Sequence, residues 1–289
     1  MDDTHYDKVV LLLPMNGAND GVTFTDWSPA PKTITREGNT KTTTAQSKYY
    51  GSSAYFDGSG DYLSCAAIPP LLVGNIYTME AWVRRVAGAT GQESIFSFHT
   101  SSGANVFVVT LTNVFGTTFS TFTLHPVEYD VWTHLAVVRL SDTMKIFVNG
   151  ILRHTVSVGA NPIGATDLFT LGQEYDNGPT PSDFFLGYMQ DVRITNGVAR
   201  YSTDFTPPDK LIGSVSGTVY DVNGDPAARK IVAWPRLIHP PVAPHIYTTT
   251  SSAEDGTYSL TVPATDLCRV VLADEATLYN DIIDRVIPE

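Results

Sequence analysis

The chain has 289 residues and a net charge of −12, and charged residues make up only 17% of it. A chain this acidic has no basic stripe to neutralise phosphates, so the composition argues against nucleic-acid binding. Strand-forming and turn-forming residues are abundant, whereas long runs of Ala, Leu, Glu and Lys are missing, which favours an all-β protein. On size alone we expect about two domains.

The segment 8–17 contains the first predicted strand, which is strongly apolar. Pro14 and the turn residues after it end this strand. Its apolar part is too short to cross a bilayer, so we expect no membrane insertion. The acidic start at Met1 lacks the basic region of a signal peptide, so we expect a soluble product of the cytoplasm. Residues 16–53 are polar and predict loops around short strands such as 33–36.

The middle of the chain alternates between apolar and polar residues with a period of two, the pattern of strands in a two-sheet sandwich. Residues 77–85 alternate most cleanly and place Met79, Ala81 and Val83 on one face. Two further short strands flank a Gly-rich turn at 57–61. Other strands are predicted at 93–98, 106–111, 132–139, 144–148, 151–156, 169–172 and 185–194.

Asn149 and Gly150 separate two of these strands by two residues, which predicts a type I′ hairpin turn because both positions need positive φ. His134 shares a strand face with Trp132, and no His or Cys pairing typical of zinc surrounds it. We expect His134 at the edge of the core. Trp82 and Trp132 both fall within strands and are expected to be core residues.

The strand series ends in Arg-Ile-Thr-Asn-Gly-Val-Ala-Arg-Tyr at 193–201, followed by Phe-Thr-Pro-Pro at 205–208. Together with Trp-Thr-His-Leu-Ala at 132–136 and Val-Asn-Gly at 148–150, it resembles a laminin-G-like, concanavalin A-type jelly roll. The resemblance covers about residues 6–206 and implies a recognition module rather than a catalyst. The sequence of this last segment, 193–208, is most similar to that of laminin-G-like domains carried by tailed bacteriophages.

Residues 207–213 are predicted to be a linker, because paired prolines stop a strand and stiffen the chain. A second strand pattern follows, with Ser-Gly-Thr-Val-Tyr at 216–220 and Asp-Gly-Thr-Tyr-Ser-Leu at 255–260. It resembles the small Greek-key β-sandwich called transthyretin-like or carboxypeptidase-regulatory-like. We therefore predict a jelly roll at 1–206 and a small sandwich at 214–289, whose end resembles the C-termini of phage virion proteins.

Calcium is the one metal that the laminin-G-like resemblance implies, held at a rim by carboxylates and backbone carbonyls. By that resemblance Asp57, Asp61 and Asp191 are candidate ligands, and Asp20 is a weaker one. The alternative is that Asp57 and Asp61 are turn residues that bond their own backbone, and that Asp191 anchors a neighbouring loop. A recognition role requires no cofactor.

Aromatic residues in loops are the candidates for glycan contact, because a sugar ring stacks on an aromatic face while its hydroxyls bond at the edge. Trp27 lies in an early loop, and Tyr175, Asn177 and Phe184 lie in or beside the long loop 173–184. Long loops on rigid sandwiches often carry function. Packing of each aromatic residue within its own loop is the alternative.

The same jelly roll also hosts glucanases, whose Glu-x-Asp-x-x-Glu motif places two carboxylates on one strand. Glu128 and Glu174 each begin a Glu-Tyr-Asp sequence, but neither is followed by the third carboxylate. We therefore expect no enzyme activity. Cys65 and Cys268 fall in different predicted domains, so no disulfide is expected between them.

These features predict a non-enzymatic surface protein of a tailed bacteriophage particle, on the tail tip or fibre or decorating the capsid. Its expected partners are other virion proteins and, through exposed loops, polysaccharide on the host surface. A carbohydrate-binding adhesin or lectin module is the alternative, and a glycoside hydrolase is less favoured. Assembly into a homo-oligomer stays open, since no coiled-coil repeat drives it.

Overall fold

The computed structural model describes residues 3, 5–66, 75–88, 92–100, 105–111, 113–116, 119–123, 127–159, 168–175, 180–208, 212–220, 223, 225–228, 230–235, 247–263, 268–273 and 279–286. The chain forms two compact units, Lys8–Asp209 and Met1–Asp7 with Lys210–Glu289. Antiparallel strands build both units, which confirms the predicted all-β class. The only helix among these residues is η1 (Tyr6–Lys8), and none there is long and apolar enough to cross a membrane.

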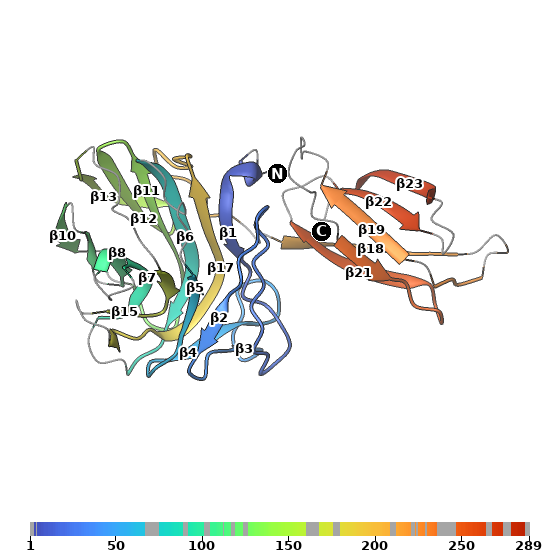
Figure 1. Ribbon diagram of the computed structural model, residues 1–289, viewed down its shortest axis with the longest axis horizontal. Helices are drawn as coiled ribbons and strands as arrows, with labels where there is room; N and C mark the ends of the chain where they lie inside the picture. The colour runs from blue at the N-terminus through green and yellow to red at the C-terminus, as the bar shows by residue number, and fades with distance from the viewer. Residues whose placement is uncertain are drawn as a thin grey trace. The chain divides into compact units, whose positions relative to one another are not determined.

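Eight strands of the larger unit form one sheet, here called sheet A (Figure 1). The strand order is β13-β12-β11-β6-β17-β4-β3, and β1 pairs with β17 beside this path. The strands of sheet A are β1 (Val9–Leu13), β3 (Lys41–Thr43), β4 (Ser53–Asp57), β6 (Ile76–Arg85), β11 (Trp132–Leu140), β12 (Thr143–Val148), β13 (Ile151–Ser157) and β17 (Leu186–Asn196).

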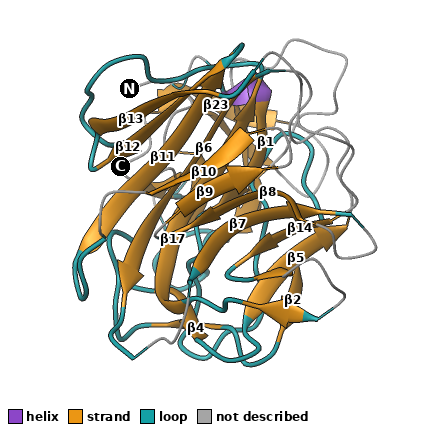
Figure 2. Cartoon of the chain, turned by 90° about the vertical axis from the view of Figure 1, so that its left-hand side faces the viewer, coloured by secondary structure: helices purple, strands orange, loops and turns teal. Residues whose placement is uncertain are grey.

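Seven strands form the second sheet of the larger unit, sheet B, in the order β10-β9-β8-β7-β14-β5-β2. Figure 2 shows this sheet toward the viewer. Its strands are β2 (Thr35–Glu37), β5 (Tyr62–Ala66), β7 (Ser94–His99), β8 (Asn105–Thr110), β9 (Asn113–Gly116), β10 (Phe119–Thr123) and β14 (Leu168–Leu171). Strands β9 and β10 were not predicted from the sequence.

The core of the larger unit lies between sheets A and B, where alternate residues of each strand point inward. Met79, Ala81 and Val83 of β6 are fully buried there, as their spacing predicted. They belong to the same apolar cluster as Phe98 and Phe169 of sheet B. The larger unit is therefore a two-sheet sandwich with a continuous apolar core.

The outer face of sheet A, opposite the core, carries both strand tryptophans. Leu135 and Val137 of β11 point into the core, so Trp132 has the parity of the outward residues and is half-buried. The prediction that Trp132 is a core residue is therefore wrong. Trp82 also faces outward, but it is buried, and its ring meets that of Tyr49 edge-on at 6.0 Å.

The hairpin between β12 and β13 has the predicted turn. Asn149 and Gly150 have φ values of 52° and 76°, as a type I′ turn requires. The Asn149 side chain also accepts a hydrogen bond of 2.9 Å from the amide of His134, which fixes the turn against β11.

A β-bulge at Asp191, whose φ is 52°, divides β17 into two halves. Both halves pair with β6 along one edge. Along the other edge, the first half pairs with β4 and the second half pairs with β1. The bulge thus lets one strand serve two different neighbours.

Residues 197–208 leave β17 and pack on the outer face of sheet A. The rings of Tyr201 and Phe205 stack with centroids 3.5 Å apart and planes 3° apart, and both meet Phe147 of β12 edge-on. The amide of Phe205 donates a hydrogen bond of 2.9 Å to the carbonyl of Gly150. This exit segment, residues 197–208, is therefore held down by the sandwich.

The smaller unit contains a two-stranded sheet and a four-stranded sheet. The first joins β18 (Ile212–Thr218) to β21 (Thr257–Pro263), and the second has the order β20 (Tyr247–Thr250), β19 (Lys230–Pro235), β22 (Cys268–Ala273), β23 (Tyr279–Val286). Strand β18 begins inside the predicted linker 207–213, and β23 was not predicted. The resemblance of this unit to a transthyretin-like sandwich stays a prediction.

Candidate ligand-binding site

Asp57 and Asp61, two of the candidate calcium ligands, use their carboxylates to hold backbone amides. Asp61 is fully buried and accepts hydrogen bonds from the amides of Asp57, at 3.0 Å, and Asn39. Asp57 accepts a bond of 2.8 Å from the amide of Ser59 within its own turn. Burial raises the pKa of Asp61, and these amide bonds partly offset that effect. Asp20, the weaker candidate, forms an ion pair of 2.6 Å with a lysine.

Asp191, the third candidate, lies in the bulge of β17 and is 2% exposed. The hydroxyl of Tyr50 donates to its carboxylate at 2.7 Å, so Asp191 anchors the loop before β4. Because Leu186 pairs with Asp57, Asp191 lies five residues, or about 16 Å, further along the strand. The three aspartates do not come together. In the described ranges no group of three or more His, Cys, Asp or Glu residues could hold a metal ion.

Two predicted glycan contacts, Tyr175 and Phe184, lie around Tyr62, which the sequence analysis did not single out. The ring centroids of Phe184 and Tyr62 are 6.5 Å apart with planes 32° apart. Tyr175 meets the ring of His99 edge-on at 4.5 Å, and a side-chain hydrogen bond joins Tyr175 to Tyr62. We call these four residues the Tyr62 cluster. All but the buried His99 are half-buried at the surface.

Three elements far apart in the sequence build the Tyr62 cluster. Tyr62 opens β5 and His99 ends β7 of sheet B, while Tyr175 belongs to the short hairpin of β15 (Glu174–Tyr175) and β16 (Pro181–Ser182). This hairpin stands in the segment predicted to be a long loop. The amide of Gly172 and the carbonyl of Asp183 both hydrogen-bond to β7, at 3.2 and 2.9 Å. Both ends of the segment are therefore fixed to sheet B.

A chain of hydrogen bonds beneath Tyr175 fixes the tautomer of His99. The hydroxyl of Thr170 donates to the carbonyl of Gln173 at 3.1 Å, so it must accept from Nε2 of His99, also at 3.1 Å. Nδ1 of His99 is then a buried acceptor with no partner among the described residues. Burial lowers the pKa of His99 to about 4, so the ring is neutral at pH 7. His99 therefore presents a polar but uncharged ring to Tyr175.

The surface of the Tyr62 cluster combines ring faces with phenol hydroxyls. Burial, the largest cause, and the nearby Tyr175, the second, raise the pKa of Tyr62 to about 12, so its hydroxyl stays protonated. A protonated phenol both donates and accepts hydrogen bonds, while its ring offers an apolar face. Such a surface can stack on a flat ligand that carries hydroxyls at its edge.

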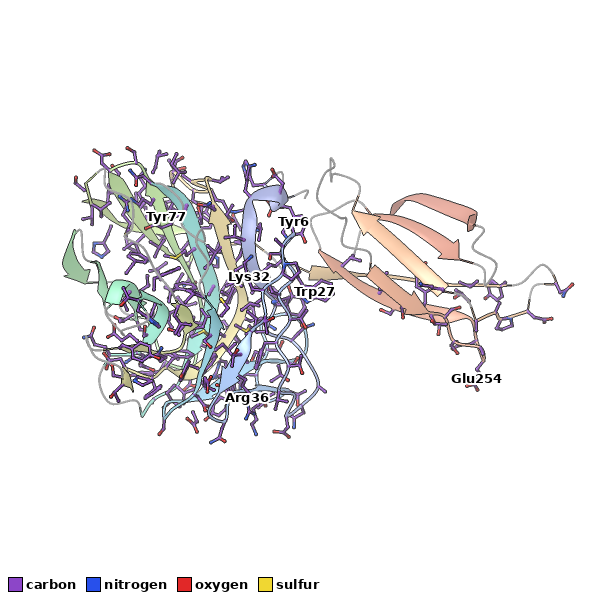
Figure 3. All side chains as sticks on the ribbon, viewed as in Figure 1. Tyr6, Trp27, Lys32, Arg36, Tyr77 and Glu254 are labelled. Carbon is purple, nitrogen blue, oxygen red and sulfur yellow. The ribbon has the colours of Figure 1, made fainter. Side chains whose placement is uncertain are left out.

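The remaining aromatic candidate, Trp27, lies elsewhere. It is half-buried, and its amide donates a hydrogen bond of 2.7 Å to the carbonyl of Leu12. Figures 1 and 3 place Trp27 on the side of the larger unit opposite β15. Asn177 lies outside the described residues. The predicted set is therefore only partly brought together.

Residues 57–200 match a laminin G family model that describes the concanavalin A-like lectin/glucanases superfamily. The larger unit has a concanavalin A-like fold. This agrees with its two stacked antiparallel sheets and with the predicted jelly roll. No curated protein sequence matches the chain.

Solved structures share the fold at low sequence identity. One is domain 4 of AbnA, an extracellular GH43 arabinanase of Geobacillus stearothermophilus, in complex with arabinotriose. Its sequence identity is 18% and its TM-score is 0.50, and the match covers 66% of this chain and 94% of that one. The binding domain of botulinum neurotoxin D/C VPI 5993 has 13% identity and a TM-score of 0.50, over 94% and 79% of the chains. The neurotoxin DC binding domain in complex with rat synaptotagmin II has 12% identity and a TM-score of 0.50, over 94% and 86%. At these identities the likeness concerns the fold.

The carboxylates considered for glucanase chemistry lie in two separate segments of the larger unit. Glu174 is 1% exposed within β15, and Asp176 lies outside the described residues. Glu128 is exposed beside β11, and Asp130 forms an ion pair of 2.9 Å with Arg84. A glycosidase needs two carboxylates that face one ligand; among the described residues of these two sequences, Glu174 is buried and Asp130 is held in an ion pair.

Proposed function

We propose that this protein is a non-enzymatic carbohydrate-binding module whose binding surface is the Tyr62 cluster. The observation that carries the proposal is the meeting of three half-buried rings, Tyr62, Tyr175 and Phe184, on one surface. Their faces suit the apolar face of a sugar, and the phenol hydroxyls suit its edge. Binding of this kind needs no cofactor.

The arabinanase domain with this fold supports the choice of ligand, because it was solved in complex with arabinotriose. Arabino-oligosaccharides are therefore the first probes. The buried Glu174 and the ion-paired Asp130 support a binding role rather than hydrolysis. Incubation with the bound oligosaccharide should accordingly release no reducing sugar.

A glycan array followed by calorimetry with the best ligand tests this proposal. We expect Tyr62→Ala and Phe184→Ala each to weaken binding by about tenfold or more, since stacking and the buried ring area are both lost. Tyr220→Ala is the matched control, because Tyr220 is 60% exposed in the smaller unit. An array without any bound glycan, or equal affinity in all variants, would refute the role of the cluster.

We further propose that the protein acts on the surface of a tailed bacteriophage particle, on the tail or the capsid, bound to other virion proteins. The support is the resemblance of the exit sequence at 193–208 to phage versions. Its Arg193, Tyr201 and Phe205 also have structural roles in packing and hydrogen bonding. The sequence resemblance alone therefore carries the particle assignment, and host-surface polysaccharide is the matching ligand.

Cryo-electron microscopy and mass spectrometry of purified particles test the particle assignment. We expect the chain in the particle proteome, and density for two linked β-units on the tail or capsid. Particles without this chain would remove the virion assignment, whereas the carbohydrate-binding proposal would still be judged by the array.

A further inference from the structure

A row of five partly exposed side chains crosses the outer face of sheet A, in register from strand to strand. Lys41 of β3 pairs with Tyr55 of β4, Tyr55 with Tyr188 of β17, Tyr188 with Arg84 of β6, and Arg84 with Trp132 of β11. Paired residues in antiparallel strands lie side by side on one face. We call Lys41, Tyr55, Tyr188, Arg84 and Trp132 the aromatic row.

The rings of the aromatic row lie beside one another and beside a cation. The centroids of Tyr55 and Tyr188 are 5.1 Å apart, and the guanidinium carbon of Arg84 lies 5.8 Å from the ring centre of Tyr188. Trp132 follows Arg84 on the next strand, and each of the five residues is half-buried. From Tyr55 to Trp132 the row spans three strand spacings, or about 14 Å.

Each cation of the row is paired with a carboxylate that the backbone holds in place. Lys41 lies 2.6 Å from Asp20, and Arg84 lies 2.9 Å from Asp130. Both aspartates have positive φ, 60° and 62°. The amide of Asp20 donates a hydrogen bond to the carbonyl of Thr42, the residue after Lys41. The amide of Asp130 donates one to the carbonyl of Arg85. Donors and acceptors are therefore fixed together on either side of the two tyrosines.

We propose that the aromatic row binds an extended, neutral, hydroxyl-rich polysaccharide chain that lies across the strands. The proposal rests on the proposed carbohydrate-binding function but assigns a second surface, on the opposite sheet from the Tyr62 cluster. Rings on neighbouring strands stack on successive sugar units, and the paired cations and carboxylates donate to and accept from hydroxyls.

Two features select this ligand class. The length of the row exceeds one sugar ring, so affinity should rise with chain length until the row is filled. Each cation is already neutralised by its aspartate, and the whole chain has a net charge of −12, so an acidic polymer gains no charge attraction. Exposed ion pairs contribute little to stability, so a ligand can share their hydrogen bonds at low cost.

Affinity electrophoresis in gels containing neutral or acidic polysaccharides, followed by calorimetry with oligosaccharides of increasing length, tests the proposal. We expect retardation by at least one neutral polymer, little dependence on salt, and affinity that grows with length. Tyr188→Ala and Trp132→Ala should each weaken binding by about tenfold. Tyr188→Phe should keep most of the affinity, and Tyr220→Ala, in the other unit, should keep all of it.

Different experimental outcomes would refute the proposal for the aromatic row and the proposal for the Tyr62 cluster. If Tyr62→Ala and Phe184→Ala abolish binding while the row variants match wild type, the aromatic row proposal is wrong and the proposed function stands. Retardation only by acidic polymers, lost on adding salt, would also overturn it, because charge rather than stacking would then carry binding. If no carbohydrate binds the wild type, both proposals are wrong. Unfolding curves of the variants separate lost contacts from lost folding.

Discussion

The hydroxyl of Tyr201 donates a hydrogen bond of 2.7 Å to the carboxylate of Glu80, 121 positions earlier in the chain. The guanidinium of Arg193 bonds to the other oxygen of that carboxylate at 2.7 Å, and Nε2 of His134 lies 3.3 Å from the first. Burial alone would raise the pKa of Glu80, but Arg193 and His134 hold it well below its usual range. A buried, ionised carboxylate thus ties the exit segment to sheet A.

Tyr201→Phe should destabilise the larger unit by about 1.5–3 kcal/mol, the usual range for a hydrogen bond to a charged group. The ring can keep its stacking on Phe205, so the fold should persist. Urea unfolding measures the effect. Tyr188→Phe, at a half-buried hydroxyl, is the control and should change stability by less than about 0.5 kcal/mol. Equal stability of the two variants would contradict the role given to Glu80.

Gly150→Ala should cost far more stability than Gly197→Ala, although the two glycines have nearly equal φ, 76° and 74°. A Cβ on Gly150 would lie 1.9 Å from the carbonyl oxygen of Phe205, whereas a Cβ on Gly197 would meet no atom within 4 Å. Gly197→Ala should therefore cost only the left-handed backbone penalty of about 1–2 kcal/mol. Similar urea midpoints for both variants would show that the exit segment is not packed against this turn.

Acidification should weaken the fold through His99. Its pKa is about 4 in the folded protein, below the ordinary value of about 6.5, so the unfolded chain binds the proton more readily. The stability from the neutral ring is complete above pH 6.5 and is lost as the pH falls toward 4, by on the order of 2 kcal/mol. His99→Gln should remove this part of the pH dependence. Parallel pH profiles of the two proteins would contradict the burial of His99.

Asp61→Ala should destabilise the protein by about 2 kcal/mol whether calcium is present or chelated, since it leaves two backbone amides without their acceptor. Thermal unfolding with calcium and with chelator measures this. Asp57→Ala, which removes an acceptor from one amide in a partly exposed turn, is the milder comparison. If calcium raises the stability of wild type and Asp61→Ala abolishes that rise, Asp61 is a calcium ligand after all.

Local sequence patterns predicted most strands of the larger unit and the inward face of β6, but they missed β9, β10 and the β15–β16 hairpin. The alternation at Met79, Ala81 and Val83 predicted the core side of β6, because side chains of a strand point to opposite faces in turn. Asn149 and Gly150 predicted the hairpin, because a two-residue turn of this kind needs two positive φ values. Both patterns are local in the sequence, so they can be recognised without knowing which strands lie next to each other.

The pairing of strands, and with it the two candidate surfaces, depends on long-range contacts that become visible in the folded chain. Tyr62 meets Tyr175 and Phe184 because β5 and the β15–β16 hairpin both attach to sheet B. The aromatic row exists because β4, β17, β6 and β11 pair in that order, which is not their order in the chain. Alternation assigns Trp132 to a face but not to the core or the surface. That outcome depends on what covers the face, a long-range matter that no local pattern encodes.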